Sequence, residues 1–204
     1  MKRVEAVTNL DEWFKDSLGT ALQKQQVSMD PATEHYMVNL LSCFARAENL
    51  YEVTRDGYGL KPLAIMLSDA LESPSPMARH IALQRLGDVS LFISGFFQDS
   101  LARRAVDVDY YARMGGGAYD TLSGLPPRTI REQALHSVFG ELASKFLQCV
   151  EVIADVAQQA RVFDERDVLR LYDVYLKTGS ARAKRALTGL GIVPSFNVSS
   201  RTQH

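Results

Sequence analysis

A single acid, Asp88, stands beside the most apolar stretch of the chain, the uncharged run from Val89 to Phe97. Apolar residues recur around it with helical spacing on nearly every face, which is typical of a helix buried among other helices. Burial of a carboxylate without a partner is strongly disfavoured. We therefore expect Asp88 to be mostly out of water, with a cation within hydrogen-bonding reach. The candidate cations are the arginines Arg79, Arg85, Arg113 and Arg131.

His80 and Gln84 lie on the same side of this predicted helix as Asp88 and form a polar seam with it. One interpretation is structural: the seam holds a satisfied ion pair or a bond to a neighbouring helix end. The other is functional: the seam is the polar wall of a ligand pocket, because carboxylates with perturbed pKa values gather at such sites. We prefer the first interpretation and keep the second as the alternative.

The next predicted helix carries clustered tyrosines and three successive glycines at 115–117. Each glycine costs a helix about 1 kcal/mol relative to alanine, so the helix could break there and offer N–H groups to an anion. We favour an unbroken helix whose glycines mark close packing, since Gly87, Ser90 and Ser94 form a matching strip of small residues. A ligand pocket beside these helices would be lined by Asp88, His80, Phe92, Tyr110, Tyr111, Arg113 and Tyr119.

The spacing of potential metal ligands does not match a metal or cofactor site. None of the four histidines has a glutamate three residues before it, as di-iron bundles require, and the chain has no Cys-x-x-Cys zinc motif. Glu132 and His136 are four residues apart and share a helix face, but no second cluster accompanies them. We predict no metal site and no cofactor.

Residues 161–204 carry eight Lys or Arg and four acids, a net charge of +4 in a chain whose net charge is −1. Two short helices around a glycine-containing turn give this region a superficial likeness to a helix-turn-helix. Acids are mixed with the basic residues on the first helix, so we do not expect nucleic acid as a partner. We predict a helical hairpin over 161–190, packed on the rest of the chain, and a flexible tail over 193–204.

Composition indicates an ordinary globular protein. The 204 residues fit one domain, and 46% are hydrophobic and 23% charged. The two cysteines, Cys43 and Cys149, lie in apolar helical patterns, so we expect buried free thiols in a reducing compartment. Apolar runs are far shorter than the roughly 20 residues that a spanning helix needs. We predict a cytoplasmic protein without membrane insertion.

Helix start and stop signals recur along the chain, and strand patterns are nearly absent. The predicted fold class is all-α, a single-domain irregular bundle of seven or eight helices over residues 1–192. Asn9, Asp30 and Pro76 mark helix starts, while Gly57 and Gly59 mark a loop over residues 49–60. The longer predicted helices span about 10–22, 31–45, 62–71, 76–98, 107–124 and 128–160.

Two stretches, "LGDVSLFISGFF" and "DYYARMGGGAY", are similar to an uncharacterised family of all-helical bacterial proteins. The similarity covers residues 80–125. This resemblance implies a helical fold and a bacterial origin, and it implies no activity.

Two functions from different classes fit these patterns. The first is a non-catalytic interaction or regulatory protein, a homo-oligomer or an adaptor for a protein partner, because apolar helix faces are numerous and no catalytic constellation occurs. The second is a small-molecule-binding protein or enzyme with its pocket between the helices at 76–98 and 107–124. We prefer the first. A closed contact between those helices would favour it, and a cavity with convergent polar groups would favour the second.

Overall fold

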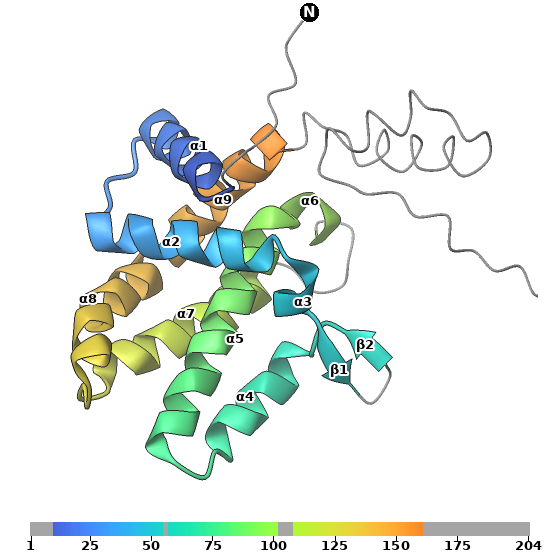
Figure 1. Cartoon of the computed structure of the whole chain (residues 1–204), viewed down its shortest axis with the longest axis vertical. Coiled ribbons are helices and arrows are strands. Elements are labelled where there is room, and N and C mark those ends of the chain that lie inside the picture. Colours follow the sequence, from blue (N-terminus) through green and yellow to red (C-terminus); the bar gives the residue numbers. More distant parts are fainter. Residues whose placement is uncertain (1–9, 55–56, 102–107, 161–204) are drawn as a thin grey trace, which may run out of the picture. The chain divides into compact units, whose positions relative to one another are not determined.

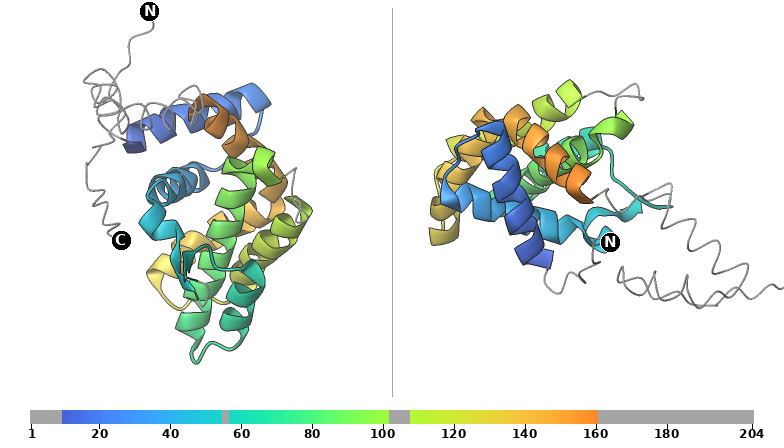
Figure 2. Two further views of the ribbon diagram at one scale, coloured as in Figure 1. Left: turned by 90° about the vertical axis from the view of Figure 1, so that its right-hand side faces the viewer. Right: turned by 90° about the horizontal axis from the view of Figure 1, so that it is seen from above.

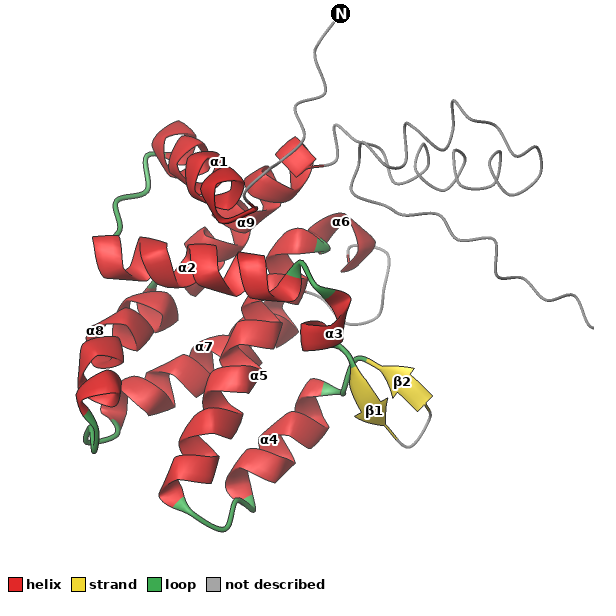
Figure 3. Cartoon of the chain, in the orientation of Figure 1, coloured by secondary structure: helices red, strands yellow, loops and turns green. Residues whose placement is uncertain are grey.

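The computed structural model describes residues 10–54, 57–101 and 108–160 (Figure 1). Within these ranges there are seven helices of nine or more residues, two single-turn helices and one two-stranded hairpin (Figure 3). In chain order the elements are α1 (Leu10–Gln25), α2 (Pro31–Phe44), α3 (Ala47–Leu50), β1 (Glu52–Thr54), β2 (Gly57–Gly59), α4 (Leu63–Leu71), α5 (Pro76–Phe96), α6 (Gln98–Leu101), α7 (Val108–Gly124), α8 (Ile130–Ser144) and α9 (Phe146–Ala160). The predicted all-α fold class is confirmed.

One compact unit runs from Asn9 to Gln159. The other unit combines Met1–Thr8 with Ala160–His204 and lies almost wholly outside the described residues. The predicted hairpin over 161–190 and the predicted tail over 193–204 therefore lie outside the described residues. So does the predicted N-cap, Asn9.

Helix α5 is the central element of the described unit and packs against α7, α4 and α2 (Figure 1). Between Leu86 and Gly95 every residue of α5 is buried except Asp88, which is partly buried. The two buried serines of this stretch are satisfied by their own helix: Ser90 Oγ donates to the carbonyl of Leu86 and Ser94 Oγ to that of Ser90, both at 2.7 Å. The sequence pattern thus correctly identified a helix that is buried on nearly all sides over residues 86–95.

Glycines allow α5 to approach its neighbours closely. A Cβ placed on Gly87 would lie 2.6 Å from the ring of Tyr119, and one placed on Gly115 would lie 2.5 Å from the Cβ of Ser90. Helix α7 continues through all three of its central glycines without a break. The prediction of an unbroken, closely packed helix is therefore confirmed, although a Cβ on Gly117 would meet nothing within 4 Å.

The predicted helix over 128–160 is wrong, because the chain turns at Lys145 and forms α8 and α9 instead. Lys145 has φ −110° and ψ 20°, outside the helical range, and its N–H closes α8 on the carbonyl of Glu141. The Lys145 ammonium donates to the carbonyl of Ser28 at 2.7 Å and to Glu141 Oε1 at 2.8 Å. The bond to Ser28 is a tertiary contact that holds the turn, and the turn lets Phe146 pack against Gly115 of α7.

The predicted loop over 49–60 contains a short antiparallel hairpin instead. Residues Glu52 and Gly59 are paired at one end of the ladder, and Thr54 and Gly57 at the other. The sequence here includes Asp56-Gly57, a dipeptide typical of hairpin turns. The glycines that suggested an irregular loop are thus compatible with two very short strands.

Helix α1 lies beside α9 at one end of this unit (Figure 2). Lys24 Nζ pairs with Asp155 Oδ1 at 2.9 Å, and Gln25 Nε2 donates to Asp155 Oδ2 at 2.8 Å. On α9, Cys149 is a buried free thiol whose pKa burial raises to about 12. Cys43 is also free, as predicted, but the expectation that it is buried is wrong: it lies on α2 outside the stripe that enters the core and is exposed.

Candidate functional site

Asp88 is held by two tyrosines from two other helices. Its Oδ1 accepts a hydrogen bond from Tyr36 Oη on α2 at 2.7 Å and another from Tyr119 Oη on α7 at 2.6 Å. Gln84, one turn earlier on α5, donates from Nε2 to Tyr36 Oη at 3.0 Å. Three helices therefore meet at a single carboxylate oxygen.

The expected arginine partner of Asp88 is absent from the described contacts, and this prediction is wrong. Arg85 turns toward the end of α3, where its guanidinium donates to the carbonyls of Asn49 at 2.6 Å and Leu50 at 3.1 Å. It also lies over the ring of Phe44, 5.1 Å from the centroid. Helix-end carbonyls need donors, so Arg85 satisfies them and tyrosine hydroxyls satisfy Asp88.

The surroundings of Asp88 shift its titration toward neutral pH. Burial raises the pKa of Asp88 to about 6, although the hydrogen bonds from Tyr119 and Tyr36 and the charge of Arg85 favour the ionised form. Burial, together with the adjacent Asp88 carboxylate, also raises the pKa of both tyrosines well above the usual value. The tyrosines therefore remain protonated donors at every physiological pH.

The second oxygen of Asp88 is left for other partners. Within the described part of the chain no hydrogen bond reaches Oδ2, and Asp88 lines a pocket of about 570 Å³. The wall formed by α5 includes the polar residues His80, Gln84, Arg85 and Asp88, whereas Arg131 and Glu132 come from α8. The apolar part of the lining consists of Met77, Ile81 and Leu135.

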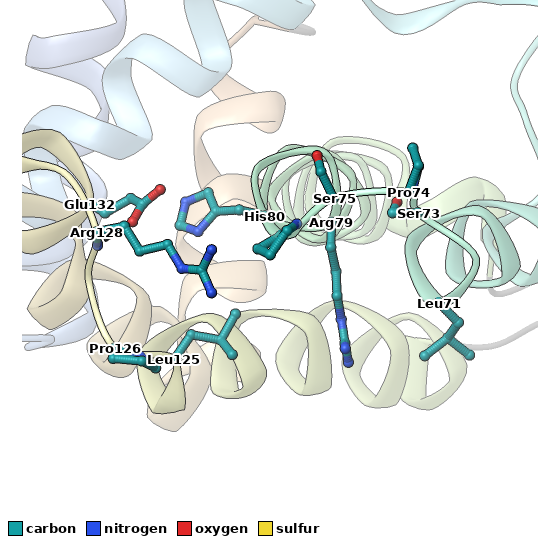
Figure 4. Close-up of a pocket in the computed structure, with 11 residues that line it drawn as sticks. Leu71, Ser73, Pro74, Ser75, Arg79, His80, Leu125, Pro126, Arg128 and Glu132 are labelled. Carbon is teal, nitrogen blue, oxygen red and sulfur yellow. Dashed lines mark hydrogen bonds between the residues drawn. The ribbon is translucent and has the colours of Figure 1, made fainter.

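A second pocket of about 320 Å³ adjoins the first and shares His80 and Glu132 with it. Figure 4 shows Arg128 and Glu132 pointing from the start of α8 toward His80 on α5. Glu132 is buried, and its Oε2 accepts from the backbone N–H of Arg128 at 2.6 Å, while Thr129 caps the helix through the N–H of Glu132 at 3.1 Å. Glu132 is thus engaged in starting α8, and His136 of the same predicted pair is exposed.

Of the residues proposed from sequence, the structure brings Asp88, His80 and Tyr119 together. His80 lies in the pocket lining with its ring edge toward Phe139, at a centroid distance of 5.9 Å. Tyr119 is fully buried, stacks on Phe139 and donates its hydroxyl to Asp88. His80 and Asp88 line the pocket, and Tyr119 holds Asp88 without lining it.

The other proposed residues lie elsewhere. Phe92 belongs to an aromatic cluster with Phe44 and Phe96, at centroid distances of 5.3 and 5.2 Å. Tyr110 packs edge-on against Tyr111 and precedes Tyr119 by nine residues, about 13 Å along the helix axis. Arg113 on the same helix is exposed. The contact between α5 and α7 is closed at its glycines, and the pocket beside Asp88 lies toward α8 instead.

Sequence reasoning missed Tyr36 and Leu135. Tyr36 stands next to the apolar stripe of α2, and a tyrosine on such a face usually needs a partner for its hydroxyl. That signal shows that Tyr36 requires an acceptor but does not identify Asp88, which is 52 positions away.

Comparisons of the chain with protein-family models, curated proteins and solved structures find no match. Among the described residues, no three His, Cys, Asp or Glu side chains are grouped so as to hold a metal ion. A search of the same residues finds no helix with the length and apolar character needed to cross a membrane.

Proposed function

We propose that this protein binds a small organic molecule in the pocket between α5 and α8. The observation that carries the proposal is Asp88: a partly buried carboxylate whose Oδ1 is fixed by two tyrosines and whose Oδ2 has no donor from the described chain. A concave site with apolar walls and a few convergent polar groups is the usual form of a ligand site. The proposed function is binding, without an assigned reaction.

The hydrogen bonds that position Asp88 favour a ligand-binding site over a packing gap without a function. Tyr36 and Tyr119 hold the carboxylate from opposite helices, and Gln84 orients Tyr36 in turn. A polar group held in this way is positioned before any ligand arrives, which lowers the entropic cost of binding.

Native mass spectrometry of the freshly purified full chain tests the proposal. We expect a non-covalent adduct that disappears on denaturation, and we expect Leu135→Trp, which fills the pocket, to lose it. Leu147→Trp is the matched control, because Leu147 is exposed on α9 and does not line the pocket. Bare chain in every spectrum, together with no change in melting temperature with any compound of a small-molecule library, would contradict the proposal.

Self-association through exposed apolar side chains is the second candidate function, in line with the interaction protein preferred from sequence. Large hydrophobic residues are exposed on α4, α5 and α8, including Ile65, Ile81 and Ile130 at 50%, 59% and 91%. Exposed apolar groups of this kind can mark protein contacts. The same native spectra report the oligomeric state, and a dimer that Ile81→Lys converts to monomer would favour this candidate.

We propose a bacterial, cytoplasmic setting for either function. Cys43 is an exposed free thiol and Cys149 a buried one, and thiols persist in reducing compartments. The bacterial origin rests on the resemblance of residues 80–125. Counting both thiols in denatured, unreduced protein checks the redox part of this proposal.

A further inference from the structure

We propose that the ligand is an organic ammonium compound, a protonated amine attached to an apolar body, whose N–H groups donate to Asp88 Oδ2. This inference rests on the proposed function and adds the chemical class of the ligand. It is drawn from the unused carboxylate oxygen, the charges around it and the apolar part of the pocket wall.

Among the described residues, no cation forms a direct bond to the Asp88 carboxylate. The charge of Arg85 favours the ionised form of Asp88, but both terminal nitrogens of Arg85 donate to the carbonyls of Asn49 and Leu50. The groups of the described chain that donate to Asp88 are two tyrosine hydroxyls, and their hydrogen bonds bring no positive charge. A partly buried carboxylate in this state favours a ligand that brings both a donor and a cation.

A metal ion does not fit this site. Calcium takes six to eight oxygen ligands and magnesium a near-octahedral set, whereas Asp88 offers one oxygen without a donor from the described chain. Glu132, the other acid in the lining, already accepts from the backbone of Arg128. An ammonium group needs far fewer acceptors, so a single fixed oxygen is a sufficient anchor for it.

The walls of the pocket favour an apolar body on the amine. Met77 and Ile81 are 46% and 59% exposed, and Leu135 completes the apolar side on α8. Covering such side chains removes apolar surface from water, which is favourable in proportion to the area covered. Two cations, Arg85 and Arg131, also lie in the lining, so the experiment must distinguish an ammonium ligand from an anionic one.

Three probes of similar shape and different charge test the inference on the full chain: benzylamine, benzyl alcohol and benzoate. Isothermal titration calorimetry at pH 8 should show that benzylamine binds at least about tenfold more tightly than benzyl alcohol, because a charge-assisted hydrogen bond replaces a neutral one. Benzoate should bind least. This comparison uses unmodified protein and does not depend on whether a variant folds.

The variant Asp88→Asn should abolish the preference for benzylamine, since it removes the charge and replaces an acceptor by a donor. Asp120→Asn on α7 is the matched control, because Asp120 is exposed and outside the pocket lining; its preference should match the wild type. Equal binding of all three probes, or tightest binding of benzoate, would overturn the ammonium assignment while leaving ligand binding intact. No binding of any probe, with bare chain in native spectra, would overturn the proposed function as well.

Discussion

The single residue that links fold and site is Asp88, and its two oxygens have different tasks. Oδ1 accepts from two tyrosine hydroxyls and so joins α2, α5 and α7, while Oδ2 receives no hydrogen bond from the described chain and Asp88 lines the pocket. The fold therefore needs an acceptor at this position rather than a negative charge. An asparagine side chain provides such an acceptor at almost the same place.

We predict that Asp88→Asn leaves the free energy of unfolding at pH 8 within about 1 kcal/mol of the wild type or raises it, because a costly partly buried charge is removed. Asp88→Ala should lose about 2–3 kcal/mol, because two buried hydroxyls lose their acceptor. Urea denaturation of the three proteins measures both changes. If asparagine were as damaging as alanine, the negative charge would be structural and the assignment of the two oxygens would be wrong.

The titration of Asp88 gives a pH prediction of definite sign. Its pKa is raised by burial from 3.8 to about 6 in the folded protein, so folding favours the protonated form. The stabilisation of the folded state by protonated Asp88 is present below about pH 4. It is lost as the pH rises to about 6, which lowers the free energy of unfolding by up to about 3 kcal/mol. The charged or titratable side chains close to it, or lining the pocket beside it, are Tyr36, His80, Arg85, Tyr119, Arg131 and Glu132.

Other carboxylates act in the opposite sense, so the prediction concerns a difference between two proteins. Asp155, for example, has a pKa lowered by hydrogen bonds from Gln25 and Lys24, and its stabilisation is lost on acidification. Subtracting the unfolding free energy of Asp88→Asn from that of the wild type at each pH isolates Asp88. This difference should fall between pH 4 and 6, and a difference that stays flat would show that the pKa of Asp88 is not raised.

At the residue scale, the sequence indicated that Asp88 needs a bonding partner but did not identify that partner. An acid beside an uncharged run of a helix must find a partner, and this follows from helical geometry alone. Whether that partner is a cation or a hydroxyl depends on which side chains the neighbouring helices bring close to Asp88. The two that do so, Tyr119 and Tyr36, lie 31 and 52 positions away in the sequence. Arg85 was the nearest candidate in sequence, yet the end of α3 offers its guanidinium two carbonyls instead.

At the scale of elements, the glycines of α7 have separate roles that a matched pair of substitutions can test. A Cβ on Gly115 would collide with Ser90 and Phe146, while a Cβ on Gly117 would meet nothing within 4 Å. We predict that Gly115→Ala lowers the free energy of unfolding by about 1–3 kcal/mol through overpacking. Gly117→Ala should raise it by about 0.5–1 kcal/mol, because alanine is the better helix former.

Thermal or urea unfolding of both variants gives the comparison directly. Equal effects of the two substitutions would mean that α5 and α7 do not meet at the described distance. The result would also bear on the pocket, because the same contact positions Tyr119, whose hydroxyl fixes Asp88.

Helix positions were largely predictable, and helix ends less so. Asp30 and Ser75 cap α2 and α5 through the N–H groups of Ala32 and Ala78, as local sequence chemistry indicates. The sequence next to Lys145 contains neither proline nor glycine, so it carries no local signal for the turn. Its cause is tertiary, since the Lys145 ammonium binds the carbonyl of Ser28, 117 residues away.

At the scale of the whole molecule, one core accounts for the compact unit. Buried hydrophobic residues from α1 to α9 form a single cluster, which begins at Phe14 and ends at Val156. The all-α class followed from periodicity, because helical apolar stripes specify which faces must meet. The location of the pocket did not follow from periodicity, since it depends on α7 packing against α5 while α8 packs on α7 and supplies the other wall of the pocket.

The compact unit should fold independently of the rest of the chain. A fragment comprising residues 9–159 contains every member of the core cluster, so we expect it to fold with a cooperative melt and a helical circular dichroism spectrum. A shorter fragment, residues 9–144, is the control: it lacks α9, which contributes eight buried residues including Phe146 and Ile153, and it should not melt cooperatively. If the 9–159 fragment were unfolded while the full chain melted cooperatively, the core would depend on residues outside it, and the binding experiments would then have to be confined to the full chain.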